Sequence, residues 1–247
     1  MKIAVFSDVH GNMDALEKVL EDAQQENCEK FFVLGDYAMA GPEPDAAVRF
    51  FMEKHSEDNF YMIQGNTDEM IGNYSQSVYD NVKEHAPVMA EALKDDFGII
   101  SVAGREFLKN LPPQLSIEEE GVSMLLVHGS PRKNNEDILP DIPMSSVSEM
   151  VKDVKESIIL CGHTHIPCGF QTATRKTVIN VGSVGRPFTP EPKSCYLTIT
   201  LADGKALFEH KFVQYNNERA ALKLQKRTFL GANKLANTLI NPEIRHF

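Results

Sequence analysis

Tryptophan is absent from this sequence of 247 residues, and cysteine, long apolar runs and positive charge are scarce. The four cysteines have no Cys-x-x-Cys spacing, which argues against a thiolate zinc site and a disulfide framework. No apolar run has the length of a membrane span, and the chain opens on a strand-like segment instead of a signal peptide. We therefore expect a cytoplasmic protein without a membrane partner.

Basic residues are outnumbered, with 25 Lys and Arg against 35 Asp and Glu and a formal net charge of −10. An acidic surface repels polyphosphate backbones, so we do not expect a protein that coats nucleic acid. The chain is 42% hydrophobic and 24% charged, which is ordinary for a globular protein with a real core. Its length suits one large domain, alone or with a small appendage.

Three strand-then-helix units open the chain, and polar residues beside a glycine follow each strand. Strands are predicted at Ile3 to Phe6, Phe31 to Leu34 and Phe60 to Ile63. The polar residues that follow them are Asp8 and His10, then Asp36, then Asn66. Repeated strand–helix units predict an α/β fold with parallel strands, in which sites gather beyond the carboxyl ends of the strands.

Histidines follow two later strands. The strand predicted at Val122 to Val127 ends in His128, and the stretch Ile159 to Ile166 holds His163 and His165. In an extended segment, residues i and i+2 project to the same side, roughly 6.5–7 Å apart. That spacing suits one ligand on each of two neighbouring metals better than two ligands on one metal.

The strand ends together supply nitrogen and oxygen donors and no sulfur. These donors are Asp8, His10, Asp36, Asn66, His128, His163 and His165. Such a set suits Mn²⁺, Fe²⁺ or Zn²⁺, and we favour manganese. It is too large for one tetrahedral ion but sufficient for two ions that share a carboxylate. Two such ions can hold a hydroxide between them and clamp the oxygens of a phosphoryl group during in-line displacement.

These motifs, in this order, resemble the calcineurin-like metallophosphoesterase superfamily, and most of all its compact prokaryotic phosphoesterases. The motifs are D-x-H from Asp8, G-D-x-x-x-x-G from Gly35, G-N at Gly65, H-G at His128, G-H-x-H from Gly162 and the loop Asn180 to Gly185. The resemblance runs from Ile3 to about Val213. It implies a four-layer α/β fold in which helices flank a two-sheet β-sandwich over residues 1–215. Residues 216–247 are then expected to form a C-terminal helical tail packed on the same domain.

The resemblance also implies roles for the donors. Asp8, His10, Asp36 and His165 would hold the first metal. Asp36, as the bridge, would hold the second metal together with Asn66, His128 and His163. The catalytic residues would be Asp36, Asn66 and His128, and the substrate would be bound by Asn66, Asn12, Arg132 and Arg186. The implied reaction is hydrolysis of phosphate mono- or diesters, on a small molecule or a nucleotide.

One departure from the family keeps alternatives open. Phosphoprotein-phosphatase relatives carry a histidine proton donor directly after the G-N motif, and Thr67 stands there in this chain. Asp68 or His85 could compensate for it. Thr67 argues against a phosphoserine/threonine phosphatase, which stays an alternative, as does a protein-binding scaffold without activity. The complete donor set argues against the scaffold, and an ordinary surface role is open for Arg132 and for Arg186.

Overall fold

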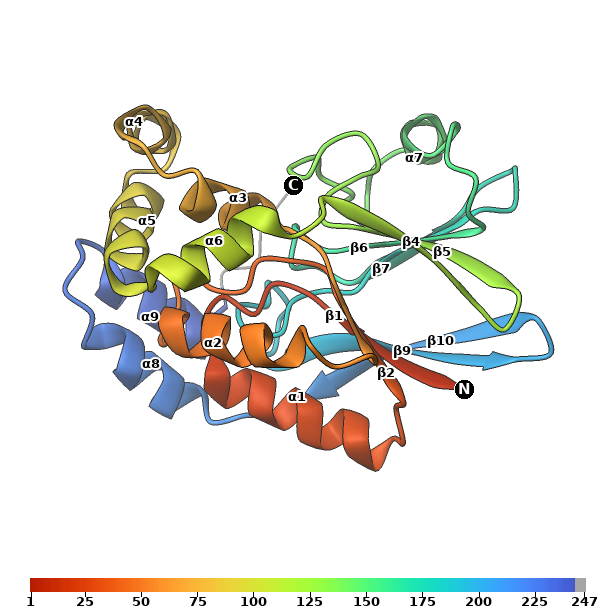
Figure 1. The fold of residues 1–247 in the computed structure, drawn as a ribbon, viewed down its shortest axis with the longest axis horizontal. Helices are drawn as coiled ribbons and strands as arrows, with labels where there is room; N and C mark the ends of the chain where they lie inside the picture. The colour runs from red at the N-terminus through yellow and green to blue at the C-terminus, as the bar shows by residue number, and fades with distance from the viewer. Residues whose placement is uncertain (243–247) are drawn as a thin grey trace.

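Two mixed five-stranded sheets lie face to face with helices on their outer sides in the computed structural model, which describes residues 1–242 (Figure 1). This arrangement confirms the predicted α/β sandwich flanked by helices. The last residues of the expected C-terminal tail, 243–247, lie outside the described part of the chain.

The first sheet has the strand order β10-β9-β1-β2-β3. Its strands are β1 (Lys2–Phe6), β2 (Lys30–Val33), β3 (Phe60–Met62), β9 (Ser194–Ala202) and β10 (Lys205–Val213). β1, β2 and β3 run parallel to one another, with α1 (Met13–Gln25) and α2 (Pro44–Lys54) in the connections. The predicted strand–helix repeat with parallel strands is thereby confirmed. β9 and β10 form an antiparallel hairpin, and β9 pairs antiparallel with β1, which completes the sheet.

The second sheet has the strand order β4-β5-β6-β8-β7. Its strands are β4 (Gln114–Glu119), β5 (Val122–Val127), β6 (Ile158–Cys161), β7 (Cys168–Gln171) and β8 (Thr177–Asn180). β5, β6 and β8 are parallel, whereas β4 and β7 pair antiparallel at the two edges. The carboxyl ends of β5 and β6 therefore meet at one edge, where the histidine motifs follow them.

The helical region that follows β3 is divided into shorter helices. They are α3 (Asn66–Gly72), α4 (Gln76–His85) and α5 (Pro87–Ile99), followed by α6 (Val102–Asn110). Ser75 caps the start of α4 by accepting from the Val78 amide, and Pro87 takes the first position of α5. A proline has no amide hydrogen for a helix interior, so it separates these two helices. α7 (Met144–Met150) lies between β5 and β6 in the sequence.

The layer between the two sheets is hydrophobic. Val5 and Phe32 of the first sheet pack with Met124 and Leu160 of the second, and all are fully buried. Side chains alternate between the two faces of a strand, so each sheet also presents apolar residues on its outer face. Burying one such side chain contributes about 1.5–3 kcal/mol to the stability of the fold.

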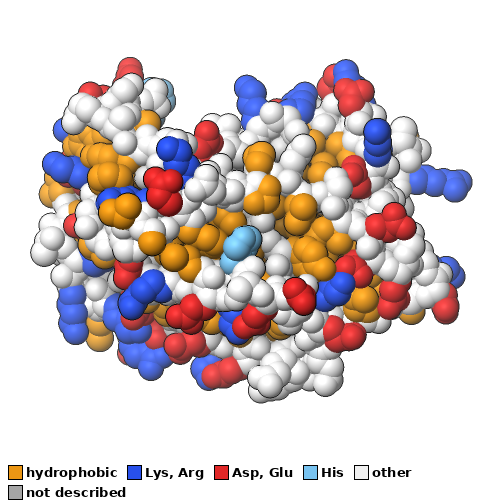
Figure 2. All heavy atoms as spheres, viewed as in Figure 1, with side chains coloured by type: hydrophobic (Ala, Val, Ile, Leu, Met, Phe, Trp, Pro, Cys, Tyr) orange, Lys and Arg blue, Asp and Glu red, His pale blue; other side chains and the backbone are white. Residues whose placement is uncertain are grey.

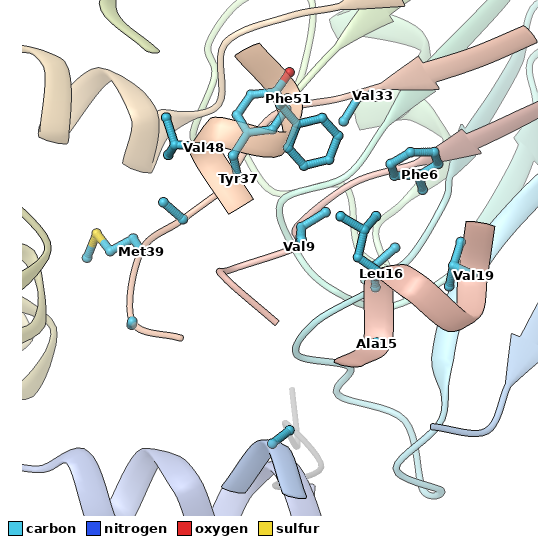
Figure 3. Packing of buried hydrophobic residues seen from close by; sticks show 14 of the residues in the cluster. Phe6, Val9, Ala15, Leu16, Val19, Val33, Tyr37, Met39, Val48 and Phe51 are labelled. Carbon is cyan, nitrogen blue, oxygen red and sulfur yellow. The ribbon is translucent and has the colours of Figure 1, made fainter. Parts of the chain in front are cut away.

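A second hydrophobic cluster lies between the first sheet and the helices. Figure 3 shows Tyr37, Val48 and Phe51 packed together within it, and the rings of Tyr37 and Phe51 lie 4.7 Å apart. α8 (Asn217–Gln225) and α9 (Ala232–Ile240) contribute Leu224 and Leu235 to the same cluster. The two C-terminal helices therefore share a core with the helices that follow β1 and β2.

In the part of the chain that the structure describes, no helix combines the length and the apolar character that crossing a membrane requires. On the face drawn in Figure 2, acidic and basic side chains are interspersed among the described residues.

Candidate metal centre

The predicted donors come together because the strands that precede them end at one edge of the sandwich. Asp8 and His10 follow β1, Asp36 follows β2, Asn66 begins α3, His128 follows β5, and His163 and His165 follow β6. The His163 amide donates to Asp8 Oδ2 at 3.0 Å, which joins the loop after β6 to the loop after β1. The centre is thus built by both sheets.

The backbone is in the left-handed region at most of these positions. The residues with positive φ are Asp8 (56°), His10 (47°), Asp36 (58°), His163 (67°) and His165 (63°). Such a conformation costs of order 1–3 kcal/mol per residue and persists only where the surrounding structure enforces it. The residue types, aspartate and histidine, do not predict this backbone conformation, although glycines beside the motifs indicate where two segments of the chain approach closely.

The first group of ligand atoms comes from Asp8, His10 and His165, and these atoms lie within 4.8 Å of one another. His165 Nε2 is 3.2 Å from Asp8 Oδ1 and 3.1 Å from His10 Nε2. All three residues are buried. They belong to the set that the sequence assigned to the first metal.

The second group consists of Asp8, Asp36 and His128, again within 4.8 Å. His128 Nε2 lies 3.4 Å from Asp36 Oδ2 and 2.9 Å from Asn66 Oδ1. Asp36 Oδ2 is also 3.8 Å from His10 Nε2, so it reaches toward both groups. Asp8 belongs to both groups, and the two carboxylates lie near histidines of both. The resemblance implies Asp36 as the bridge, and this assignment stays a prediction.

Backbone carbonyls set the orientation of three imidazoles. The Nδ1 atoms of His10, His128 and His165 lie 2.7, 2.7 and 2.6 Å from the carbonyl oxygens of Met39, Leu34 and Arg186. A carbonyl oxygen only accepts, so each Nδ1 must carry the hydrogen. The Nε2 atoms of the neutral rings are then bare and point into the centre, as metal ligation requires.

These residues fit a divalent cation. With Nδ1 protonated on both rings, the Nε2 lone pairs of His10 and His165 face each other at 3.1 Å. Asp8 Oδ1 is buried and accepts no hydrogen bond from the described residues. An unsatisfied buried carboxylate oxygen is costly, and a cation shared by these three atoms removes both problems.

The charge states are set by burial and by the neighbouring groups. Burial acts to raise the pKa of the Asp8 and Asp36 carboxyls, but the adjacent imidazoles lower both below their ordinary value. Burial and His165 lower the pKa of His10 to about 4. Burial also opposes the charged form of His128, yet Asp36 and Asp8 raise its pKa to about 10. At neutral pH, without metal, His10 is neutral, whereas His128 holds a proton that a metal would displace.

His163 lies at the rim of the centre. Its ring is 5.3 Å from the ring of His128, and its Nε2 is 3.3 Å from Asp137 Oδ1. The His163 side chain is 19% exposed, against 0% for His128. Sequence reasoning missed Asp137, because it lies in a loop that had no recognisable motif.

Asn12 is engaged by the protein on both sides of its amide. Its Oδ1 accepts from the Ala15 amide at 3.2 Å, and its Nδ2 donates to the Gly185 carbonyl at 2.9 Å. These bonds cap α1 and connect it to the loop Asn180 to Gly185. They support a positioning role, and contact between Asn12 and the substrate stays a prediction.

The two candidate phosphate-binding arginines have different surroundings. Arg132 is 45% exposed and pairs with Glu136, with Nε donating at 3.0 Å. Arg186 donates Nη1 to Met89 Sδ at 3.7 Å, and its charge helps to keep the pKa of His10 low. Arg186 is therefore near the metal ligands, whereas the charge of Arg132 is balanced by a carboxylate.

The residues considered as substitutes for the missing histidine acid lie in unlike places. Asp68 is fully buried and accepts from the amides of Asp36, Tyr37 and Gly65, at 2.7, 3.1 and 2.8 Å. Burial and then Asp36 raise the pKa of Asp68 to about 7. Its carboxylate holds the backbone around Asp36, which is a supporting position. His85 is exposed at the end of α4.

Known proteins match the chain over most of its length. A family model of the calcineurin-like phosphoesterase superfamily domain matches residues 1–204. An uncharacterised protein of Methanocaldococcus jannaschii is 28% identical over 242 residues, covering 91% of this chain and 92% of that protein. A hypothetical protein from Pyrococcus horikoshii has a structure with a TM-score of 0.84 and 23% identity, covering 97% of this chain and 98% of its own. The structure of a metallophosphoesterase from Sphaerobacter thermophilus has a TM-score of 0.75 and 21% sequence identity, covering 97% of this chain and 98% of its own.

A two-sheet sandwich with buried aspartates and histidines gathered at its strand ends is the framework of a metallophosphoesterase. The chain belongs to the calcineurin-like phosphoesterase superfamily. The family resemblance that the sequence motifs indicated is thereby confirmed, and the structural matches show the same fold over 98% of each of those chains.

Proposed function

We propose that this protein is a dinuclear metal-dependent phosphoesterase that hydrolyses small phosphate mono- or diesters or nucleotides. The observation that carries the proposal is the pair of buried ligand groups that share Asp8. In the first group, the Nε2 atoms of His10 and His165 face one another with both Nδ1 atoms bound to carbonyls, which is unfavourable without a cation between them. We favour a pair of manganese ions over iron or zinc, because the ligands are imidazole, carboxylate and amide oxygen.

The protein's own residues account for binding and orientation. Two divalent ions bound here would supply charge neutralisation at phosphorus and lower the pKa of a bound water. Asp8, Asp36 and the histidines would hold them, and the carbonyl-bound imidazoles allow little rotation of the ligands. Asn66, whose Oδ1 contacts His128, has its amide nitrogen available to orient a phosphate oxygen. Arg186 adds positive charge beside His10.

The ligand set is complete, which favours an enzyme over a scaffold without activity. Thr67 occupies the position of the histidine acid in phosphoprotein phosphatases, so we place small esters ahead of phosphoserine and phosphothreonine peptides. No observation in the described residues favours the protein-phosphatase alternative.

A substrate panel on Mn²⁺-loaded protein tests the proposal. It contains aryl mono- and diesters, dinucleoside polyphosphates and phosphopeptides. The expected result is Mn²⁺-dependent hydrolysis of at least one small ester or nucleotide. Absence of turnover on the whole panel, with two ions bound, would contradict the enzymatic proposal.

A matched pair of histidine variants separates the centre from the remaining surface. His128→Ala should lower turnover by at least about 100-fold at a fixed Mn²⁺ concentration, because it deletes a ligand of the second group. His128 is buried, not at a loop edge, so we also expect a lower melting temperature. The control is His55→Ala, which removes an exposed ring that contacts Phe107. Near-normal turnover in His128→Ala at saturating Mn²⁺ would contradict the ligand assignment.

A further inference from the structure

Arg227 is a buried arginine that links the C-terminal helices to the loop after β2. It lies between α8 and α9, and its side chain is only 6% exposed. Its Nη1 donates to the Gly41 carbonyl at 2.8 Å, and its Nη2 pairs with Asp96 Oδ1 at 2.7 Å and with Asp95. Burying an arginine is expensive unless its charge is paired, and two carboxylates pair with Arg227 here. Its Nη1 and Nη2 are engaged, whereas its Nε has no hydrogen-bond partner among the described residues.

Asp96 holds the neighbouring peptide of the same loop. It is fully buried on α5, and its Oδ2 accepts from the Ala40 amide at 2.8 Å. Asp96 and Arg227 therefore grip two consecutive residues, one through its N–H and the other through its C=O. Ala40 has φ of 63°, a left-handed conformation that needs such support in a non-glycine residue.

The gripped loop is in direct contact with a ligand of the first group. The carbonyl of Met39 accepts from His10 Nδ1 at 2.7 Å and so decides where His10 Nε2 points. Gly41 packs against the backbone of His10, since a Cβ on Gly41 would lie 1.4 Å from the His10 oxygen. A displacement of residues 39–41 would therefore move or release the His10 ring.

We infer that Arg227, through its grip with Asp96 on Ala40 and Gly41, is a positioning residue that sets His10 for metal binding. Arg227 lies beyond residues 1–204, the part that the family model covers. The C-terminal helices then complete the metal centre and do more than cover the hydrophobic core. This inference rests on the proposed metal site and adds Arg227 to the residues that position its ligands.

The test is Mn²⁺ titration calorimetry on chelator-treated full-length protein. His10→Ala identifies the binding step that belongs to the first group. Arg227→Met should weaken that step by about 10–100-fold, the usual effect of losing a group that orients a ligand. The other step should stay within about twofold. Turnover should recover at saturating Mn²⁺, because the ligands themselves remain.

Lys223→Met is the matched control. Lys223 also ties α8 to the N-terminal half, through Asp14 at 3.1 Å and Glu43 at 2.7 Å, but it makes no hydrogen bond to residues 39–41. This variant should lower the melting temperature and leave both Mn²⁺ steps unchanged. If it weakens the first step as much as Arg227→Met does, the effect is general loosening and the inference is overturned.

Arg227→Met leaves Asp96 buried without its ionic partner and could fail to fold. The double variant Arg227→Met with Asp96→Asn removes both charges, and it should show the same weakened first step. A folded single or double variant that binds Mn²⁺ as the wild type does overturns the inference alone. A wild type that binds no Mn²⁺ contradicts the proposed function instead, so the two failures are distinguishable.

Discussion

A histidine serves a metal only when the correct ring nitrogen is bare, and backbone carbonyls decide this here. The rings of His10, His128 and His165 each face a carbonyl oxygen through Nδ1. Each carbonyl belongs to a loop that also contributes to the centre or adjoins it. The orientation of these three ligands is therefore set by the loop backbones, and two of the three, His10 and His165, also have positive φ.

Thr67 leads to a prediction about the leaving group. Its amide donates to Asp36 Oδ1 at 3.0 Å, and its hydroxyl is too weak an acid to protonate a departing oxygen. A general acid is typically worth about 10²–10⁴-fold, so its absence should be visible in the rates. We expect kcat/KM to fall steeply as the pKa of the leaving group rises, with aryl esters and phosphoanhydrides cleaved much faster than alkyl phosphates.

The measurement is kcat/KM over esters with leaving groups of widely different pKa, at fixed pH and Mn²⁺ concentration. A flat dependence, with chemistry shown to be rate-limiting, would reveal an acid outside this account. His85, exposed at the end of α4, is the first residue to replace in that case. Asp137, beside His163, is the second.

His128 predicts how the stability of the metal-free protein depends on pH. Burial opposes its charge, but Asp36 and Asp8 raise its pKa to about 10, above the ordinary value of 6.5. The folded state then binds the proton more tightly than the unfolded state. The stabilisation is complete below pH 6.5 and is lost as the pH rises toward 10, at up to about 1.4 kcal/mol per pH unit.

Thermal unfolding in excess chelator between pH 7 and 9 measures this slope. Asp68, whose pKa burial raises to about 7, acts mainly below this window, and Cys28, whose pKa burial raises to about 11, acts mainly above it. His128→Asn should flatten the decline in melting temperature, and His55→Ala should preserve it. An equal slope in His128→Asn and the wild type would show that the imidazolium–carboxylate pair does not exist.

At the scale of elements, the parallel strands and the position of the site could be predicted from the sequence. Apolar strands followed by helices predicted the parallel core, and the donors after each strand predicted a site at their carboxyl ends. Asp137 and Arg227 could not be predicted, because their positions follow from tertiary contacts between loops and not from local spacing. Pro87 indicates the break between α4 and α5, but the apolar residues on either side keep a partial helical spacing, which favours one longer helix.

Two glycines give a matched prediction about these elements. A Cβ on Gly41 would lie 1.4 Å from the His10 carbonyl oxygen, so Gly41→Ala must push apart the two loops that carry ligands. A Cβ on Gly98, within α5, meets nothing within 4 Å. Gly98→Ala should stabilise the protein by up to about 1 kcal/mol, because glycine is the poorer helix former.

Differential scanning calorimetry with and without Mn²⁺ checks both substitutions. Gly41→Ala should lower the melting temperature and remove most of the Mn²⁺-induced shift, whereas Gly98→Ala should raise the melting temperature and keep that shift. A full Mn²⁺-induced shift in Gly41→Ala would mean that the contact between these loops does not control the ligands.

At the scale of the whole molecule, the sandwich serves to bring distant segments to one edge. Loops after β1 and β2 of the first sheet meet loops after β5 and β6 of the second, and the C-terminal helices brace the loop after β2. Under the proposed function, the acidic protein would still attract a phosphate ester, since two bound divalent ions would outweigh the two ionised carboxylates of Asp8 and Asp36.

The central claim is that two metal ions are bound between these ligands, and anomalous diffraction from Mn²⁺-loaded crystals, with metal analysis of protein purified without chelator, tests it most directly. The account predicts two ions per chain that share the carboxylates of Asp8 and Asp36. The first is held with His10 and His165, and the second with His128, with Asn66 and His163 beside it. A single ion, coordinated away from Asp36 and His163, would contradict it.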